Sequence, residues 1–339
     1  MKCAIYGAGS LGTVLGAYLT RANVDVVLVN RNVEHIKALK ENGARIVGRV
    51  YMQMKVKAAL PEEMGDGFDC IFLMTKQLDN VNIVRFLEPK LKEDGVIVTL
   101  QNGLPEPLIA SIIGPSRTLG CIVEWGATMK GPGISELTSD EDGLYFHMGK
   151  MPGVSDEKFQ IVKQTLEKMC PVDVEDNILG ARFTKMLVNS TFSGLGTVIG
   201  GSFGAVINTK KGRELSARCM KECVEVSKAN NITLAKIQGR DVLRFFYYQN
   251  NFKKKIVKML IPIGLKNHKA IIPSMLQDIR KGKKCEVDAI NGVICEYGRK
   301  SGVLTPINDR IVEIIHKQEE GLIPLSAKNI NLFDDILSM

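Results

Sequence analysis

A glycine-rich pattern near the start of the chain could bind a phosphate group. Gly7, Ala8, Gly9, Ser10, Leu11 and Gly12 form G-x-G-x-x-G between the apolar runs 3–6 and 13–20. In a strand–turn–helix unit the first glycine permits a tight turn, the second lets the backbone approach a pyrophosphate, and the third allows close packing of helix on strand. The N–H groups at the helix start attract the anion. The pattern therefore predicts a dinucleotide site, and the flanking runs disfavour a glycine turn without a ligand.

The residues after the second expected strand, 24–29, favour NADP(H) over NAD(H). This strand continues as Asn30-Arg31-Asn32. An acidic residue at this place binds the ribose 2′-OH in NAD enzymes, whereas an arginine accommodates a 2′-phosphate. No carboxylate is present, and the planar guanidinium of Arg31 suits a phosphate. Arg31 could also be a plain surface residue, but the missing carboxylate still disfavours NAD.

Polar residues follow two further expected strands. Thr75 and Lys76 come after the run 70–74, and Gln101-Asn102-Gly103 comes after the run 96–100. Ligands of open α/β sheets bind beyond the carboxyl ends of the strands. Either segment could be only a turn, since Asn-Gly is a common turn pair. Their shared location favours contact with a ligand.

A polar stripe crosses an otherwise apolar helix expected at 179–194. Lys185, Asn189 and Ser193 recur at four-residue spacing, which places them on one side of the helix. Such side chains face either solvent or a polar cavity, because unpaired buried polar groups are costly. The spacing by itself favours a helix edge whose lysine reaches water.

Two later segments carry Ser274 and Glu286 at helix starts. Ser274 stands where it could cap the helix expected at 275–281. Glu286 begins the helix expected at 286–301, where a carboxylate is favourable. Both residues therefore have local explanations that need no ligand.

The order of these elements predicts an α/β protein of two domains. Apolar, β-branched runs at 3–6, 24–29, 70–74 and 96–100 alternate with helices, and 119–123 and 144–148 are later strands. We expect this sheet to end near residue 150. Helical periodicity then dominates, with further helices at 213–230 and 308–318, while the structure of 326–339 is left open. We predict a Rossmann-type parallel-sheet domain at 1–175, followed by an all-helical domain at 176–339.

Composition excludes several other classes of protein. The chain has 339 residues, 45% of them hydrophobic, and a net charge of +8. Its lysines are spread out, and runs such as Lys253-Lys254-Lys255 lack interleaved aromatics, so we expect no nucleic-acid partner. With no signal-peptide pattern and no apolar stretch of roughly 20 residues, we expect a cytoplasmic protein without a membrane partner.

The cysteines indicate neither a metal site nor disulfides. The sequence holds eight of them without a C-x-x-C pair or a Cys/His cluster at metal-binding spacing. Reduced and mostly buried thiols are the simpler interpretation. The mildly positive charge of the chain suits an anionic small molecule.

Taken together, these segments resemble the ketopantoate reductase family (2-dehydropantoate 2-reductase) along nearly the whole chain. The residues that carry the resemblance are Gly7 to Gly12, Arg31, Thr75-Lys76, Gln101-Asn102-Gly103, Lys185 with Asn189, Ser274-Met275-Leu276-Gln277-Asp278 and Glu286-Val287-Asp288-Ala289-Ile290-Asn291-Gly292.

The resemblance implies a role for most of these residues. Lys185 would be the general acid that protonates a ketone oxygen as NADPH delivers hydride, with Glu286 near its ammonium group. Asn102, Asn189, Ser193 and Ser274 would bind polar groups of a 2-oxo acid substrate. Lys76 and Asn102 would contact the cofactor. The implied reaction is reduction of ketopantoate to pantoate in pantothenate/CoA biosynthesis, and the helical domain could form a homodimer.

Two departures from the family pattern put the substrate in doubt. Ser193 stands where the family usually has a second asparagine one turn after Asn189, and Phe203 lies where another substrate-binding asparagine is common. A serine lacks the paired donor and acceptor of an amide, and such polar recognition provides much of the discrimination between substrates. A reductase of another 2-oxo acid is therefore an alternative. A non-catalytic NADP(H)-binding sensor is a weaker one.

Overall fold

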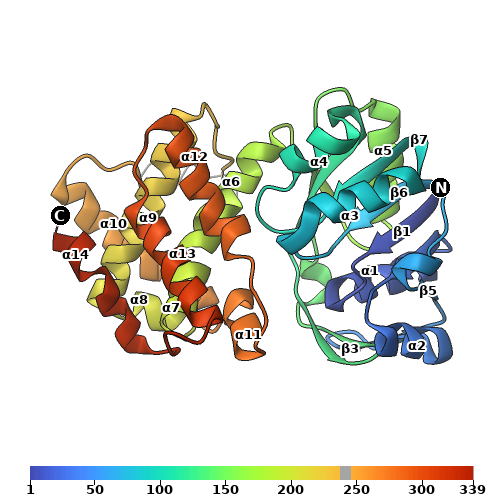
Figure 1. Ribbon diagram of the computed structural model, residues 1–339, viewed down its shortest axis with the longest axis horizontal. Coiled ribbons are helices and arrows are strands. Elements are labelled where there is room, and N and C mark those ends of the chain that lie inside the picture. The colour runs from blue at the N-terminus through green and yellow to red at the C-terminus, as the bar shows by residue number, and fades with distance from the viewer. Residues whose placement is uncertain (237–245, 339) are drawn as a thin grey trace. The chain divides into compact units, whose positions relative to one another are not determined.

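The two parts of the chain differ in their secondary structure. A computed structural model describes residues 1–236 and 246–338. Contacts divide the protein into two compact units, Met1–Ile178 (unit 1) and Leu179–Met339 (unit 2). Unit 1 contains both sheets, whereas the described residues of unit 2 form helices and connecting segments only (Figure 1).

The main sheet of unit 1 has eight strands in the order β12-β11-β8-β7-β6-β1-β2-β5. Every pairing is parallel except that of β11 with β8. From β1 the chain passes to β2 on one side and later to β6 on the other, so the strand order reverses at β1, where open α/β sheets bind ligands. The strands are β1 (Lys2–Tyr6), β2 (Asp25–Val29), β5 (Lys57–Ala59), β6 (Phe68–Leu73), β7 (Leu91–Thr99), β8 (Thr118–Val123), β11 (Phe146–Lys150) and β12 (Val172–Val174).

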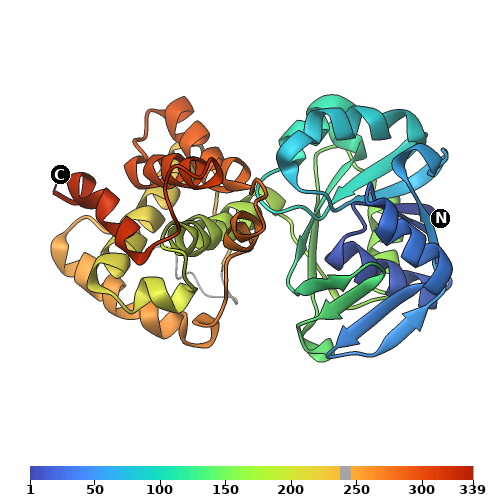
Figure 2. The ribbon, with the colours of Figure 1, turned by 60° about the horizontal axis from the view of Figure 1, so that its bottom comes forward.

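Helices cover both faces of this sheet (Figures 1 and 2). Cys3 and Ile5 of β1 belong to a core that includes residues of α1 and α5, whereas Ala4 belongs to a core with residues of α3 and α4. Burial on both faces explains why the strands are nearly continuous apolar runs. The helices of unit 1 are α1 (Ser10–Arg21), α2 (Val33–Asn42), α3 (Asn80–Leu87), α4 (Glu106–Ile113) and α5 (Asp156–Leu166).

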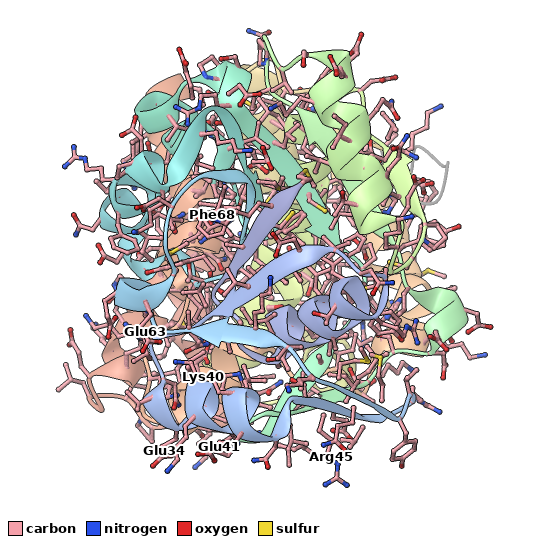
Figure 3. The ribbon with its side chains drawn as sticks, turned by 90° about the vertical axis from the view of Figure 1, so that its right-hand side faces the viewer. Glu34, Lys40, Glu41, Arg45, Glu63 and Phe68 are labelled. Atoms are coloured by element: carbon pink, nitrogen blue, oxygen red, sulfur yellow. The ribbon has the colours of Figure 1, made fainter. Side chains whose placement is uncertain are left out.

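A smaller sheet, β4-β3-β10-β9, packs against α1 and was not predicted. Its strands are β3 (Ala44–Gly48), β4 (Met52–Met54), β9 (Ala127–Gly131) and β10 (Ile134–Leu137). His35 of α2 ties this sheet to α1, because Nδ1 accepts from the Gly133 N–H at 3.0 Å and Nε2 lies 3.2 Å from Thr13 Oγ1. Burial lowers the pKa of His35, which favours the neutral ring. On the same helix, Lys40 pairs with Glu63 at 2.7 Å (Figure 3).

Unit 2 is a bundle whose core is formed mainly by α7, α9, α13 and the segments that pack on them. Two π-helices, η6 and η9, interrupt its α-helices. The elements are α6 (Ile178–Val188), η6 (Asn189–Ser193), α7 (Gly194–Val198), α8 (Phe203–Ile207), α9 (Lys210–Ala229), α10 (Asn251–Gly264), α11 (Ser274–Arg280), η9 (Asp288–Gly292), α12 (Val293–Ser301), α13 (Pro306–Glu319) and α14 (Asp334–Ser338).

The predicted fold class is confirmed, with some corrections to its elements. The sheet does not end near residue 150, because the short edge strand β12 pairs with β11. Its three residues are too few to show a sequence period. The helix α10 was not predicted, and the segment left open at the C-terminus forms a 3₁₀-helix, Ala327–Phe333, and α14.

Two expectations from composition can be compared with the structure. All eight cysteines are buried and free, as predicted. Among the helices of the described ranges, none is both long and apolar enough to span a bilayer.

Candidate active site

The predicted cofactor-binding segments lie at one edge of the main sheet. Residues 7–12 follow β1, Arg31 follows β2, Lys76 follows β6 and Asn102 follows β7. These four strands are neighbours in the order β7-β6-β1-β2 and run parallel. Their carboxyl ends therefore meet at the same edge, beside the point where the strand order reverses.

The glycine-rich turn has the geometry expected of a phosphate-binding loop. Gly7 has φ +97°, and a Cβ atom there would lie 2.5 Å from the Thr75 nitrogen. At Gly12 a Cβ would lie 2.9 Å from the Gly7 oxygen and 3.0 Å from Ile5 Cγ2, which leaves no room for a side chain between helix and strand. At Gly9 a Cβ would meet only the Gly7 oxygen, at 3.9 Å. The space beside Gly9, at the start of α1, is open to an approaching phosphate.

Arg31 is exposed just beyond β2, at the edge shared with the glycine turn. Burial raises the pKa of the Tyr6 phenol, and the nearby positive charge of Arg31 partly opposes this rise. Asn32 next to it caps α2 by accepting the His35 N–H at 3.0 Å. The backbone around Arg31 is therefore held in place, while its side chain can reach a ligand.

A buried amide pair holds the turns after β6 and β7 together, and sequence analysis did not identify it as a pair. Gln101 Nε2 donates to the Thr75 carbonyl at 2.9 Å and to Asn80 Oδ1 at 2.7 Å. Asn80 Nδ2 donates back to Gln101 Oε1 at 3.1 Å. Asn80 lies on α3, and only its proximity in space to Gln101 reveals the pair. These bonds set the position of the neighbouring residue, Asn102.

Lys76 and Asn102 differ in their surroundings. Lys76 is exposed, and Asn102 is half-buried. The Gln77 side chain donates to the Asn102 carbonyl, which fixes the backbone but leaves the Asn102 amide side chain to other partners.

In unit 2 the predicted stripe is interrupted by a change of helix type. Lys185 lies on α6, Asn189 begins η6 and Ser193 ends it. The Gly194 N–H donates to the Asn189 carbonyl five residues back, as in a π-helix. Lys185 and Asn189 are half-buried, whereas Ser193 is buried. π-Helical turns of this kind are frequent at functional sites.

Ser274 does not cap α11, contrary to the local interpretation of its position. It is the first residue of the helix, the capping position belongs to Pro273, and no side-chain capping bond is present there. Pro273, with φ −53° and ψ 139°, lies outside the helix, so α11 begins at Ser274 itself. Ser274 is exposed, and its hydroxyl can serve another purpose.

Glu286 directly precedes the second interrupted helix and is half-buried. The element η9 that follows it contacts η6, and α11 contacts both η6 and α7. These contacts bring η6, which begins at Asn189, together with α11, which begins at Ser274, and with η9, which begins two residues after Glu286. Phe203, by contrast, lies in the core, with its ring centroid 5.7 Å from that of Phe192.

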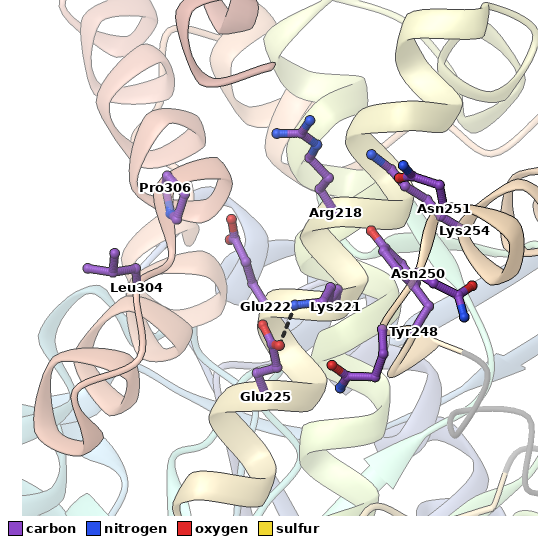
Figure 4. A pocket seen from close by; sticks show the side chains of 11 residues that line it. Arg218, Lys221, Glu222, Glu225, Tyr248, Asn250, Asn251, Lys254, Leu304 and Pro306 are labelled. Atoms are coloured by element: carbon purple, nitrogen blue, oxygen red, sulfur yellow. Dashed lines mark hydrogen bonds and ion pairs between the residues drawn. The ribbon is translucent and has the colours of Figure 1, made fainter. Parts of the chain in front are cut away.

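The two cavities described within the units lie away from these residues. One, of about 450 Å³, is lined by residues of α9, α10 and the start of α13 (Figure 4). The other, of about 670 Å³, lies at the amino ends of the main-sheet strands and includes Met1 and Asp69. Neither is lined by a predicted site residue.

Comparison with known families gives a match over most of the chain. A family model described as ketopantoate reductase PanE/ApbA matches residues 3–152, and one described as the ketopantoate reductase PanE/ApbA C terminal matches residues 177–319. The 2-dehydropantoate 2-reductase of Pyrococcus horikoshii is 28% identical over 94% of this chain and 98% of its own length. That of Aquifex aeolicus is 28% identical over 94% and 97%.

Solved structures share the fold over 95% of this chain. D-mandelate dehydrogenase, in a ternary structure with NADH and anilino(oxo)acetate, has a TM-score of 0.81 at 24% identity, over 95% of this chain and 99% of that one. A PanE/ApbA family ketopantoate reductase from Ralstonia eutropha JMP134 has a TM-score of 0.80 at 22% identity, over 95% and 99%. At these identities the similarity establishes the fold.

The open space beside Gly9 gives a direct test of the glycine turn. We expect Gly9→Ala to retain the stability of the protein but to weaken NADPH binding by about tenfold or more, roughly 1.4 kcal/mol. The added methyl group would meet no close protein atom, but it would stand where a phosphate approaches. Fluorescence titration with NADPH and thermal unfolding measure the two effects.

Gly143→Ala is the matched control, because a Cβ at Gly143 meets nothing within 4 Å. It should change neither property. Unaltered NADPH binding by Gly9→Ala would contradict the placement of phosphate at this turn.

Proposed function

This chain belongs to the ketopantoate reductase PanE/ApbA family, and from that premise we propose that it reduces 2-dehydropantoate to pantoate in pantothenate/CoA biosynthesis. It is an NADP(H)-dependent oxidoreductase of CH–OH donors. The observation that carries the choice of substrate is that relatives named 2-dehydropantoate 2-reductase align with 94% of the chain.

In this proposal residues 1–175 bind NADP(H). The turn from Gly7 to Gly12 would hold the pyrophosphate at the start of α1, and Arg31 would bind the 2′-phosphate through its guanidinium group. Lys76 and Asn102, at the ends of β6 and β7, would contact the rest of the cofactor. The open space at Gly9 and the exposed side chain of Arg31 support this assignment.

Residues 176–339 would supply the chemistry on the substrate. Bound NADPH provides the hydride for the carbonyl carbon. The Lys185 ammonium would donate its proton to the ketone oxygen and stabilise the negative charge that develops there. The Glu286 carboxylate would orient this ammonium. Half-burial of both side chains supports these roles, because electrostatic interactions weaken less where water is partly excluded.

The remaining polar residues would recognise the substrate. Asn102, Asn189, Ser193 and Ser274 offer amide and hydroxyl groups for its carboxylate, carbonyl and hydroxyl. A homodimer and a cytoplasmic location remain predictions from the sequence.

Reduction of another 2-oxo acid is the second candidate. The observation that favours it is the similarity to D-mandelate dehydrogenase, which acts on a different substrate with the same fold. Ser193 and the core residue Phe203 replace amides that are usual in the family, which would alter the hydrogen bonds offered to a substrate hydroxyl. A non-catalytic NADP(H)-binding sensor is weaker still, since Lys185 and Glu286 are both retained.

A panel of 2-oxo acids tests the choice of substrate. We expect 2-dehydropantoate to give the highest kcat/KM among branched and hydroxylated 2-oxo acids, followed as NADPH oxidation at 340 nm. A higher kcat/KM with another acid would support the reductase activity but show that 2-dehydropantoate is not the preferred substrate. Tight NADPH binding without turnover of any acid would favour the sensor.

Lys185→Ala tests the general acid. We expect kcat to fall about 10²–10⁴-fold, the usual contribution of a positioned proton donor, while NADPH affinity changes less than about twofold. Steady-state kinetics and fluorescence titration measure the two. Lys300→Ala removes an exposed lysine paired with Glu296 in the same unit and should leave both unchanged. Wild-type kcat in Lys185→Ala would remove this residue from the mechanism.

Arg31→Asp tests the cofactor preference. We expect the affinity for NADPH to fall about tenfold to a hundredfold, since a charge-assisted hydrogen bond contributes roughly 1.5–3 kcal/mol, while NADH affinity is retained or improved. Arg49→Asp, at an exposed residue paired with Asp140, serves as the control in the same titration. Equal affinities for the two cofactors before and after the Arg31 change would contradict the assignment.

A further inference from the structure

The helix that carries Lys185 and Asn189 depends on a π-turn for the direction of its polar side chains. In a regular α-helix, residues eight apart differ in direction by about 80°, because each residue turns roughly 100°. The wider turn of η6, closed by the bond from the Gly194 N–H to the Asn189 carbonyl, turns less per residue and reduces this drift. The placement of η6 thus decides how Ser193 aligns with Lys185 and Asn189.

A buried amide from another element holds this turn. Asn291, in η9, donates from Nδ2 to the Ser190 carbonyl of η6 at 3.0 Å and to Asn308 Oδ1 at 2.9 Å. Ser190, Asn291 and Asn308 are all fully buried. A Cβ atom at Gly194 would lie 3.1 Å from Asn291 Nδ2, so the absence of a side chain there lets the amide come this close.

The orientation of that amide is fixed in turn by a buried carboxylate. Glu222 of α9 accepts from the Ile307 N–H at 2.8 Å and from the Asn308 N–H at 3.1 Å, at the start of α13. It also accepts from Asn308 Nδ2 at 2.7 Å. Both oxygens of Glu222 accept backbone N–H groups here, so the Asn308 amide directs its nitrogen to Glu222 and its oxygen to Asn291. Asn291 must then present its own nitrogen to Asn308 and Ser190.

The environment of Glu222 matches this role. The residue lies beside Lys221, Glu225 and Pro306 on the cavity of Figure 4, where the dashed line marks the Lys221–Glu225 ion pair. Burial raises the pKa of Glu222 to about 7, although its hydrogen bonds to the Ile307 and Asn308 N–H groups and to the Asn308 amide lower it. Burial disfavours the charged form of Glu222, and the three hydrogen bonds that it accepts offset part of this desolvation cost.

We propose that Asn291 is a positioning residue of this enzyme, which fixes η6 through the Ser190 carbonyl and thereby aligns Ser193, at the far end of the π-turn, with Asn189 and Lys185. Glu222 and Asn308 affect the reaction only indirectly, because they orient the side-chain amide of Asn291. This inference rests on the proposed function of Lys185 and Asn189, and no part of it requires Asn291 to touch the substrate.

Asn291→Leu tests the proposal, because leucine has a similar volume and no hydrogen-bond donor. We expect kcat for the preferred 2-oxo acid to fall at least tenfold while the Kd for NADPH changes less than twofold, since the cofactor segments lie in unit 1. The control is Asn230→Leu, which removes an amide that donates to the Val226 and Tyr297 carbonyls and to Ser301 Oγ in the same unit. It should lower the melting temperature but leave kcat within about twofold.

Hydrogen exchange separates this inference from the choice of substrate. Peptides that span residues 186–198 should exchange faster in Asn291→Leu and at the wild-type rate in Asn230→Leu, whatever acid the enzyme reduces. Turnover by the wild type tests the proposed function, and the ratio of variant to wild type tests the positioning role. Wild-type kcat and wild-type exchange in Asn291→Leu would overturn the inference, as would an equal loss of kcat in Asn230→Leu.

Glu222→Gln gives a second measurement if Asn291→Leu does not fold. The NH2 group of the glutamine must face either the Ile307 or the Asn308 N–H, so one of these donors loses its acceptor and the start of α13, which carries Asn308, is held less firmly. We expect kcat to fall several-fold with NADPH affinity retained and with faster exchange at 186–198. Unchanged kcat and exchange would exclude the relay from Glu222 to the π-turn.

Discussion

The backbone of Gly7 passes so close to that of Thr75 that a Cβ atom there would lie 2.5 Å from the Thr75 nitrogen. The arrangement of the strand ends in unit 1 depends on this contact. The Gly7 and Ala8 N–H groups donate to the Val29 carbonyl, and the Met74 N–H donates to the Tyr6 carbonyl. The ends of three neighbouring strands are therefore fixed to one another, and α1 begins at a defined point above them with its N–H groups directed at one place.

Unit 2 solves a different physical problem. Its helices pack through an apolar core, which by itself tolerates small shifts of one helix along another. Buried polar groups allow far fewer arrangements, because each donor must meet an acceptor. Glu222, Asn308, Asn291 and the Ser190 carbonyl form such a chain of donors and acceptors. These hydrogen bonds connect α9, α13 and η9 to η6, which continues the helix that carries Lys185. They therefore fix the positions of these four elements relative to one another.

Family membership and substrate identity depend on different parts of the molecule. D-mandelate dehydrogenase shares the fold over 95% of this chain at 24% identity, so the fold by itself does not identify the substrate. Discrimination between substrates depends on a few side chains that hydrogen-bond their hydroxyl groups. Ser193 is buried and Phe203 packs against Phe192. From the resemblance to the family, both positions would carry amides, and a phenylalanine offers no hydrogen bond to a substrate.

The sequence by itself determined the elements that follow from local patterns. The glycine spacing, the missing carboxylate near Arg31 and the change from alternating strands to helical periodicity rest on near neighbours in the chain, so the fold class and the sheet edge could be predicted. The edge strand β12 and the smaller sheet could not, because their strands have only three to five residues each. In the smaller sheet β3–β4 and β9–β10 pair locally, but the pairing that joins them, β10 with β3, is between residues distant in sequence.

The π-turns were also decided by the tertiary structure. Residues 189–193 have an ordinary helical period in sequence. Their widened turn is accompanied by the Asn291 amide, which lies 101 residues beyond Ser190 in the chain. The same holds for the Gln101–Asn80 pair and for the carboxylate of Glu222 at the start of α13. A hydrogen bond between distant residues leaves no period in the sequence, because it forms only when packing brings a donor and an acceptor together away from water.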